Sequence, residues 1–181
     1  MILTGHEIKR HLGNDIVIHP FNESQLNSNS YNLRLGKQLL VYDDCELDCK
    51  KPVKYKIFDI PTTGYRLLPG ELYLGQTFEY TETRNLVPQI EGRSSTARLG
   101  ITIHMSAGFG DIGFCGHWTL EICVIKPIII YPEIELIQIF YHEISGTVTK
   151  TYEQGKYQGN KGVQPSLLYK DFEDRPKIPT N

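Results

Sequence analysis

The sequence predicts an all-β fold, either a sandwich, a jelly roll or a barrel, with a short N-terminal helix and an extended C-terminal tail. Two observations lead to this class. Short segments rich in β-branched and aromatic residues recur along the chain, and Gly, Pro, Asn and Asp separate them, which is typical of packed antiparallel sheets. The length of 181 residues lies within the size of one domain that buries a substantial core.

One segment near the N-terminus has the sequence signals of a helix. Thr4 followed three residues later by Glu7 is a capping box, in which two side chains satisfy free N–H groups of the first turn. Ile8 and Leu12 fall on one helical face, and Gly13 is a residue type that commonly ends a helix. We therefore expect a short helix before the first strand.

The rest of the chain divides into strands and a tail. Segments with β character occupy residues 31–42, 71–82, 84–92, 101–107, 117–124, 127–131 and 135–144. After Gly146 the composition becomes polar and rich in Gly, Lys and Tyr, which favours an extended tail over a second domain. The prediction is one β domain over residues 1–181, with a core at 1–146 and a tail at 147–181.

Charge and hydropathy limit the possible partners. The chain has 19 Lys and Arg against 21 Asp and Glu, and the formal net charge of -2 gives no electrostatic argument for binding nucleic acid or an anionic membrane. The first residues, MILTGHEIKRHLG, lack the pattern of a signal peptide, and runs such as PIIIYP are too short to span a bilayer. We expect a cytoplasmic protein with neither nucleic acid nor membrane as a partner.

The cysteines and histidines give no metal signature. Cys45 and Cys49 could supply two ligands, but a structural zinc site takes four, and the nearest partners would have to come from a distant strand. The six histidines show neither H-x-x-x-H nor H-x-H spacing. Scattered reduced thiols explain the cysteines better, and we expect no zinc.

A glycine-rich stretch, SAGFGDIGFCG at residues 106–116, contains the spacing G-x-G-x-x-G of dinucleotide-binding loops: Gly108, Gly110 and Gly113. That fingerprint needs a helix that begins at its third glycine, because the helix N-terminus receives the pyrophosphate. The stretch that follows carries Gly116, then β-branched and aromatic residues, and then Pro127 and Pro132, which disfavour a helix of ordinary length. We predict instead a strand, a glycine-rich turn that holds Asp111, and a second strand.

The segment EGRSSTARLG, residues 91–100, brings more polar side chains with possible functions close together than any other segment of the chain. A short helical turn would aim two guanidinium groups, two hydroxyls and free backbone N–H groups at one point; the side chains are those of Arg93, Ser94, Ser95 and Arg98. That arrangement would form a polyphosphate cradle. A surface turn whose arginines make ordinary ion pairs explains the same residues equally well.

Glu121 is a carboxylate inside the apolar strand segment HWTLEICV, residues 117–124. If its face of the strand is outward, it is a solvated residue, which is the usual case for Glu. If it points into a cleft, desolvation would raise its pKa and suit it to proton transfer at neutral pH. The residues themselves leave both readings open.

Taken together, these motifs resemble those of the dCTP deaminases of the trimeric dUTPase superfamily. The matching segments are NSYNLRLG at 29–36, LPGELYLGQT at 68–77, EGRSSTARLG at 91–100, SAGFGDIGFCG at 106–116, TLE at 119–121 and GKYQGNKGVQPSLLY at 155–169. They cover nearly the whole chain, in order. The resemblance implies a distorted β jelly roll and a homotrimer with nucleotide sites at subunit interfaces. It also implies dCTP as the substrate, Mg²⁺ bound with the triphosphate, and dTTP as an inhibitor.

The resemblance assigns deamination to Glu121, which would take a proton from the water that adds to C4 of cytosine and return protons to the base. It implies nucleotide binding by Arg93, Ser94, Ser95, Thr96, Ala97, Arg98, Asp111, Thr119, Leu120, Gln138, Tyr152, Lys156 and Asn160. Among these, Asp111 would meet the deoxyribose 3′-hydroxyl, and the backbone of Thr119 and Leu120 would read the pyrimidine edge. The zinc motifs of other deaminases, H-x-E and P-C-x-x-C, do not occur in the sequence, so zinc-independent chemistry is expected.

Two positions depart from the family pattern, and three bear on the product. Asn160 stands where a glutamine is common, and Gly110 replaces a bulky residue before the aspartate. Gly108, Phe109 and Gln138 resemble the members that also cleave the phosphate chain, whereas deaminase-only members carry a His-Arg pair in the turn. We therefore expect dUMP, diphosphate and ammonia as products. The alternatives are a deaminase that stops at dUTP, a dUTP diphosphatase, and a non-catalytic nucleotide-binding regulator.

Overall fold

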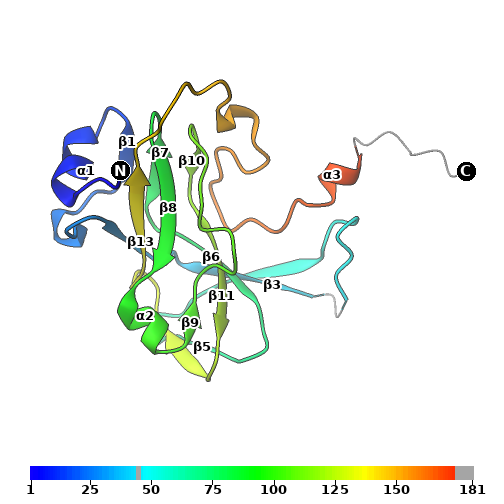
Figure 1. The fold of residues 1–181 in the computed structure, drawn as a ribbon. Helices are drawn as coiled ribbons and strands as arrows, with labels where there is room; N and C mark the ends of the chain where they lie inside the picture. The colour runs from blue at the N-terminus through cyan, green and yellow to red at the C-terminus, as the bar shows by residue number, and fades with distance from the viewer. Residues whose placement is uncertain (44–45, 174–181) are drawn as a thin grey trace, which may run out of the picture.

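The fold is a distorted all-β structure, which confirms the predicted class (Figure 1). The computed structural model describes residues 1–43 and 46–173. Within these ranges, short antiparallel strands make up most of the regular structure, helices are few and short, and the strands do not close into a continuous barrel. No helix in the described part is long and apolar enough to cross a membrane.

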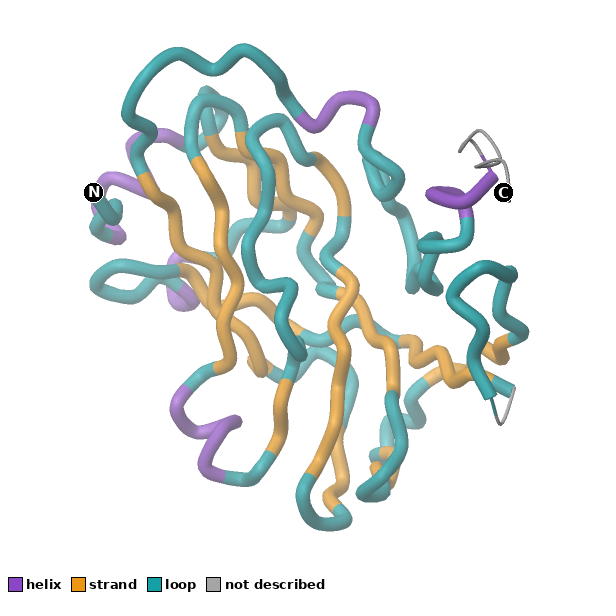
Figure 2. Tube along the Cα trace, turned by 45° about the vertical axis from the view of Figure 1, so that its right-hand side comes forward, coloured by secondary structure: helices purple, strands orange, loops and turns teal. Residues whose placement is uncertain are grey.

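The described strands pair in four small sheets. The first contains, in spatial order, β1 (Ile16–His19), β7 (Tyr80–Thr83) and β10 (Cys115–Gly116); the second contains β4 (Tyr55–Asp59), β3 (Gln38–Tyr42), β6 (Tyr73–Gln76), β11 (Thr119–Val124) and β9 (Ile101–Thr102). The third contains β12 (Ile128–Ile130) and β5 (Tyr65–Leu67), and the fourth contains β2 (Tyr31–Arg34), β13 (Glu135–His142) and β8 (Val87–Gly92). Figure 2 shows the course of these strands, and most of the buried apolar side chains of the four sheets form one core cluster.

The expected N-terminal helix is present as α1, Gly5–His11. Thr4 is its N-cap, and the Thr4 hydroxyl oxygen accepts a hydrogen bond from the N–H of Glu7 at 3.3 Å. Ile8 is fully buried, so the apolar face of the helix packs on the sheets. Gly13 follows the helix with a φ of 78°, a conformation that glycine adopts without strain.

Each expected strand segment contains at least one observed strand, but the segment at 101–107 is shorter than predicted. Its strand, β9, ends at Thr102. The N–H of Met105 donates a hydrogen bond to the carboxylate of Glu121 at 3.3 Å and not to a neighbouring strand, so the chain leaves the sheet there. Four strands, β1, β4, β5 and β10, lie outside the expected segments; they are two to five residues long and carry too few alternations to stand out.

The core lies between the sheets and sets which side chains face outward. Along β11 the exposure alternates, with Leu120 and Ile122 fully buried and Glu121 between them only partly buried. Along β13, Ile137 and Ile139 are likewise fully buried. This period of two fixes the face that each polar residue presents.

The tail after Gly146 runs along the outside of the strands and contains two short helical turns, η2 (Tyr152–Gln154) and α3 (Lys170–Glu173). Figure 1 shows it on the opposite side of the molecule from the short helix α2 (Ser94–Arg98). The tail is fastened at Val163, which is buried against Leu40 and Leu74. It therefore forms one wall of a cavity beside β11.

Candidate active site

A cavity of about 570 Å³ opens between β11 and the tail. This volume is in the range of small-molecule sites. The tail contributes Tyr152, Tyr157, Asn160, Gln164, Pro165 and Ser166; the body of the domain contributes Tyr42, Leu47, Leu72, Leu74, Ala107, Phe109, Gly110, Asp111, Phe114, His117, Trp118, Thr119 and Glu121. No Lys or Arg is among the described residues that line it. The cavity thus combines two carboxylates with aromatic and apolar walls.

Glu121 faces this cavity, which decides between the two readings that the sequence left open. It shares its face of β11 with Thr119, opposite the buried Leu120. Burial raises the pKa of the Glu121 carboxyl, while the hydrogen bond from the Met105 N–H and the nearby His104 imidazole lower it by less. A carboxyl with a raised pKa in a partly closed cavity can both accept and return a proton near neutral pH.

The loop before Asp111 packs closely on β8 and needs small residues. A Cβ on Gly108 would lie 2.5 Å from the backbone oxygen of Ile90 and 3.0 Å from the imidazole of His104. His104 is held in turn by Glu91, 3.1 Å from its Nε2. Phe109, which follows Gly108, is exposed at the cavity wall. The glycine spacing that imitates a dinucleotide loop therefore serves close backbone packing.

Gly110, one of the two departures from the family pattern, is explained by its neighbour Trp118. A Cβ at Gly110 would lie 2.3 Å from Cη2 of Trp118 and 2.9 Å from a ring carbon of Pro88. The indole ring therefore fills the space that a bulky residue before Asp111 would occupy. Trp118 is itself fixed, because its Nε1–H donates to the hydroxyl of Thr81 at 3.0 Å. Asp111 is exposed at the cavity wall, where its carboxylate is accessible to a ligand.

The predicted cradle at 91–100 does form a helical turn, α2, but it lies away from the cavity. A second hollow of about 200 Å³ is lined by Asn27, Asn32, Arg93, Ser94, Ser95 and Gln138. Arg93 is 3.1 Å from a carboxylate oxygen of Glu135 and donates to its backbone oxygen at 2.9 Å. Gln138 accepts a hydrogen bond from the hydroxyl of Ser30 at 2.9 Å. We call this space the α2 hollow.

The remaining α2 residues differ in accessibility. Thr96 is 4% exposed, and its hydroxyl donates to the backbone oxygen of Leu136 at 3.0 Å, so this side chain anchors α2 to β13. Ala97 and Arg98 are exposed and line neither space. On one chain most of the predicted nucleotide-binding residues therefore form two separate groups, one at the cavity and one at α2, while Leu120 is fully buried.

Three tail residues were predicted to bind the nucleotide. Tyr152 lines the cavity, with its ring centroid 6.0 Å from that of Phe114. Asn160 also lines it, and its side-chain amide donates to the backbone oxygen of His117 at 3.0 Å, which fastens the tail. Lys156 does not line the cavity; it forms an ion pair with Asp171 at 2.7 Å. Their roles in binding stay predictions.

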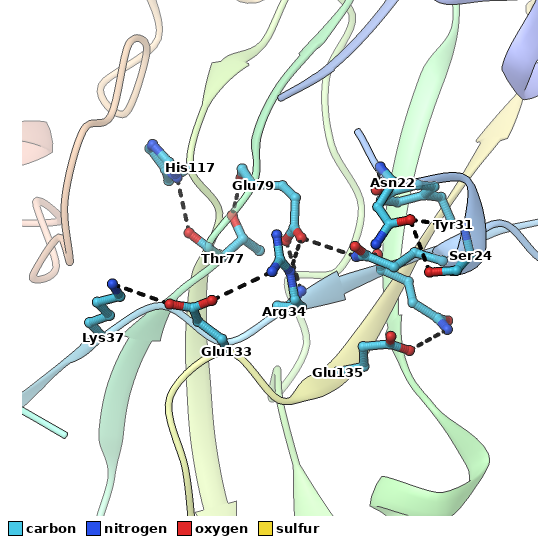
Figure 3. Close-up of polar contacts among 12 residues, drawn as sticks. Asn22, Ser24, Tyr31, Arg34, Lys37, Thr77, Glu79, His117, Glu133 and Glu135 are labelled. Atoms are coloured by element: carbon cyan, nitrogen blue, oxygen red, sulfur yellow. Dashed lines mark hydrogen bonds and ion pairs between the residues drawn. The ribbon is translucent and has the colours of Figure 1, made fainter. Parts of the chain in front are cut away.

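A buried polar network joins β2 to the strands behind the cavity (Figure 3). Its centre is Glu79, which is fully buried and accepts hydrogen bonds from the Arg34 side chain at 2.6 Å and from Gln25 at 3.0 Å. The backbone oxygen of Glu79 accepts from the hydroxyl of Thr77, whose own backbone oxygen lies 2.9 Å from Nδ1 of His117. A buried charge with this many partners holds the local backbone firmly.

Several cavity residues were not singled out from the sequence, among them Tyr42, Leu74, His117, Trp118 and Tyr157. The signal for His117 was present, because HWTLEICV alternates polar and apolar residues and places His117 on the same face as Glu121. Tyr42 and Leu74 come from strands far away in the sequence. Only the pairing of Glu121 with Leu74, and of Leu74 with Leu40 in β3, brings these strands to the cavity.

The thiols are scattered in the described residues. Cys49 is exposed, and Cys115 and Cys123 are free and partly buried. Cys45, which was weighed as a metal ligand together with Cys49, lies outside the described residues. In the described part of the chain, no group of three or more His, Cys, Asp or Glu side chains is arranged to hold a metal ion.

A family model described as dCTP deaminase-like matches residues 2–144. The chain belongs to this dCTP deaminase-like family. It is 61% identical over 173 residues to a protein of Cytophaga hutchinsonii named dCTP deaminase, dUMP-forming, covering 96% of this chain and 99% of the relative. It is 60% identical over 172 residues to a protein of the same name from Clostridium acetobutylicum, covering 95% of this chain and 99% of the relative.

A solved structure supports the fold. The 2′-deoxycytidine 5′-triphosphate deaminase from Agrobacterium tumefaciens superposes with a TM-score of 0.62 at 22% identity. The match covers 77% of this chain and 48% of that one. At this identity the likeness speaks for a shared β architecture.

Proposed function

We propose that this chain deaminates dCTP and releases dUMP, diphosphate and ammonia, with Glu121 as the general acid and base. The observation that carries the proposal is the position of Glu121, half-buried in a cavity of nucleotide size with a pKa raised by burial. The full-length similarity to relatives named as dUMP-forming dCTP deaminases supports the same reaction.

The deamination step needs one group that moves protons in both directions. The oxygen of water bonds to C4 of cytosine while Glu121 takes a proton from that water. The C4–N bond then breaks, and the amine leaves as ammonia after protons are returned through Glu121 to N3 and to the leaving nitrogen. The apolar side chain of Leu74, which lies opposite Glu121 in β6, contributes to the partly dry surroundings in which such a carboxyl works.

The second step is hydrolysis of the phosphate chain. A second water attacks the α-phosphorus, and diphosphate leaves. Phe109 is an uncharged residue at the cavity wall, at the turn where deaminase-only members carry an arginine, and the buried Gly108 before it lets the loop pack against Ile90 and His104. Mg²⁺ enters with the triphosphate as part of the substrate, as it does for many nucleotide enzymes. No zinc takes part in the proposal, because the sequence lacks the zinc motifs of other deaminases.

The proposed enzyme is a homotrimer with its active sites between subunits. The cavity holds Asp111 and Glu121 but no Lys or Arg among its described lining residues, so a triphosphate needs cations from elsewhere. Arg98 belongs to α2 and Arg93 is its N-cap, and Figure 1 shows α2 on the opposite side of the molecule from the tail. A neighbouring subunit that docks its α2 at the cavity would supply these guanidinium groups and the hydroxyl of Ser94 to the nucleotide. We propose this arrangement, and a cytoplasmic location.

Inhibition by dTTP follows from the same site. dTTP shares the deoxyribose and the triphosphate with the substrate. At C4 it carries an oxygen in place of the amine, so it has no amine to lose and is not turned over by deamination. We propose that dTTP competes with dCTP for the cavity. The measurement is the apparent KM for dCTP at increasing dTTP concentrations.

Product analysis tests the proposal. Purified protein is incubated with dCTP and Mg²⁺, and nucleotides, ammonia and diphosphate are measured in the same samples. We expect dUMP, ammonia and diphosphate in equal amounts. Accumulation of dUTP without diphosphate would show a deaminase that stops after the first step, and turnover of dUTP without any of dCTP would show a diphosphatase.

Metal dependence and assembly are tested on the same preparation. Activity should survive a zinc-selective chelator and disappear when Mg²⁺ is withheld. Mass measurement in solution should give three chains per particle. Loss of activity with the chelator, together with one tightly bound zinc per chain, would contradict the proposed chemistry.

A further inference from the structure

His117 is a cavity residue that has no role in the two steps above. Among the described residues that line the cavity, it is the one side chain able to carry a positive charge. Phosphate groups in proteins are usually met by such charges or by N–H donors. The His117 imidazole is therefore a candidate contact for the triphosphate of a nucleotide in this cavity.

His117 lies further from Glu121 than the pyrimidine ring of a bound nucleotide would extend. The alternation of partly buried and buried residues continues from β11 back through its preceding residues, so His117 and Thr119 share the face of Glu121. Four residues of extended chain separate His117 from Glu121, which corresponds to roughly 13 Å. That is further than a pyrimidine ring extends, so in a nucleotide whose C4 lies at Glu121 only the sugar or the phosphates can reach His117.

The tail meets the domain at the same place. The N–H of His117 donates to the backbone oxygen of Asn160 at 2.9 Å, and the Asn160 amide donates back to the backbone oxygen of His117. Tyr152, a predicted phosphate contact, lines the cavity from the same tail. His117 thus stands at the cavity end where the tail closes the space.

The imidazole is held by a hydrogen bond to the backbone of Thr77 (Figure 3). Its Nδ1 lies 2.9 Å from the backbone oxygen of Thr77, which can only accept, so Nδ1 carries a hydrogen. The Thr77 hydroxyl donates to the Glu79 backbone oxygen at 2.8 Å and accepts from the Trp118 N–H at 3.0 Å, which fixes this carbonyl. The ring of Tyr80 packs edge-on against the imidazole, with centroids 5.9 Å apart. Nε2 has no protein partner within the described residues and is left for a ligand.

We propose that His117, in its doubly protonated imidazolium form, binds the phosphate chain through Nε2–H and stabilises the leaving diphosphate in the second step of the proposed reaction, on which this inference rests. In that step the oxygen of water bonds to the α-phosphorus, and the bond from the α-phosphorus to the bridging oxygen breaks. The bonding pair stays on the diphosphate, and the proton of the attacking water passes to solvent. The Nε2–H hydrogen bond strengthens as negative charge grows on the leaving group.

Two substitutions of His117 test the roles of its two imidazole nitrogens separately. In His117→Asn the amide nitrogen takes the place of Nδ1 and keeps the bond to Thr77, whereas in His117→Gln the amide nitrogen takes the place of Nε2. We expect the ratio of diphosphate to ammonia formed from dCTP to fall at least about tenfold in His117→Asn, with dUTP accumulating, since a hydrogen bond to a charged group is lost. His117→Gln should recover part of the ratio. Tyr80→Phe, which keeps the ring beside His117, is the matched control and should keep the wild-type ratio.

The outcomes decide the proposal. An unchanged ratio of diphosphate to ammonia in His117→Asn would overturn it. This includes an equal fall of both products, because that pattern indicates a role in folding or in overall binding. If wild-type protein forms no ammonia from dCTP, the proposed function fails, and calorimetry then tests this inference separately. Affinity for the non-hydrolysable α,β-imido analogue of dUTP should fall in His117→Asn while affinity for deoxyuridine stays the same. Equal affinity of both proteins for the analogue would refute a phosphate contact.

Discussion

Gly116 and Asn160 lie directly against each other in an isolated parallel bridge that joins the end of β10 to the tail. A Cβ on Gly116 would lie 2.8 Å from the backbone nitrogen of Asn160, and Gly116 has a φ of 140°. Asn160 is 8% exposed and is held by the backbone oxygen of His117. The tail therefore docks on a surface that only glycine provides.

Gly116→Ala should loosen the tail. The added methyl group meets backbone atoms that cannot move aside, so the bridge to Asn160 should open and the cavity lose one wall. We expect faster cleavage of the tail by a low dose of protease and a higher KM for dCTP. Gly162→Ala is the control, because the nearest atom to its Cβ is 3.9 Å away. Equal protease resistance of Gly116→Ala and wild-type protein would contradict this docking.

Gly110→Ala should destabilise the domain through Trp118. Inserting a methyl group into a filled space typically costs about 1–3 kcal/mol of unfolding free energy. The nearest atom to this methyl group is Cη2 of Trp118, and phenylalanine lacks that second ring. In a double-mutant cycle by chemical denaturation, Gly110→Ala should therefore cost less in a Trp118→Phe background than in wild type. Additive costs would mean that these residues do not share the space.

Glu121→Gln should abolish most activity while it stabilises the fold. Loss of a general acid and base lowers rates by roughly 10² to 10⁴-fold. Because the folded-state pKa of Glu121 is raised, its favourable protonated form is present at low pH, and that stability is lost as the pH rises through the folded pKa. The melting temperature of the variant should exceed that of wild type at neutral pH and match it in acid. The reverse order at neutral pH would contradict the burial of this charge.

The pH dependence of deamination should report the same carboxyl. Glu121 must be ionised to accept the proton of water, so kcat/KM should fall on the acid side at a pH above the ordinary Glu value of about 4.3. His104 lowers the pKa of Glu121, so His104→Gln should move this limb to still higher pH. His142→Gln, a histidine that hydrogen-bonds Gln89 instead, should leave the limb in place. A limb that does not move in His104→Gln would exclude this coupling.

Lys156 and Asp171 give a further measurable effect. If Lys156 binds phosphate, the Asp171 carboxylate at 2.7 Å competes with the nucleotide for it. Exposed ion pairs are worth about 0–1 kcal/mol, so Asp171→Asn should lower KM for dCTP by up to about fivefold. Lys156→Ala should raise KM, and the effect of Asp171→Asn should vanish in that background. A lower KM in Asp171→Asn that persists without Lys156 would assign the effect to another residue.

Local patterns in the sequence predicted what local physics determines. Thr4 and Glu7 marked the start of α1, and the residues around Ser94 marked a helical turn, since capping and turn chemistry depend on neighbours in the chain. The face of Glu121 was also encoded, because apolar residues alternate with it in HWTLEICV. Reading that alternation as a period of two would have placed Glu121 with Thr119 and His117.

The rest of the site depends on contacts between distant segments. Leu74 lies opposite Glu121 only through strand pairing, and the tail reaches the cavity only because Gly116 allows Asn160 to dock. The space that Gly110 leaves is filled by Trp118, eight positions later in the chain. No local pattern encodes these contacts, so the cavity could not be built from the motifs alone.

The distance between the cavity and α2 on one chain has a consequence for heredity. In the proposed trimer, an Arg98 substitution would leave the cavity of its own chain intact and disable the reaction in a neighbour. A cell that makes normal and altered chains together would lose activity only in proportion to the share of altered chains, because each site takes α2 from one neighbour. Conversely, a chain damaged at Arg98 and a chain damaged at Glu121, each inactive alone, would restore working sites where the intact half of one meets the intact half of the other.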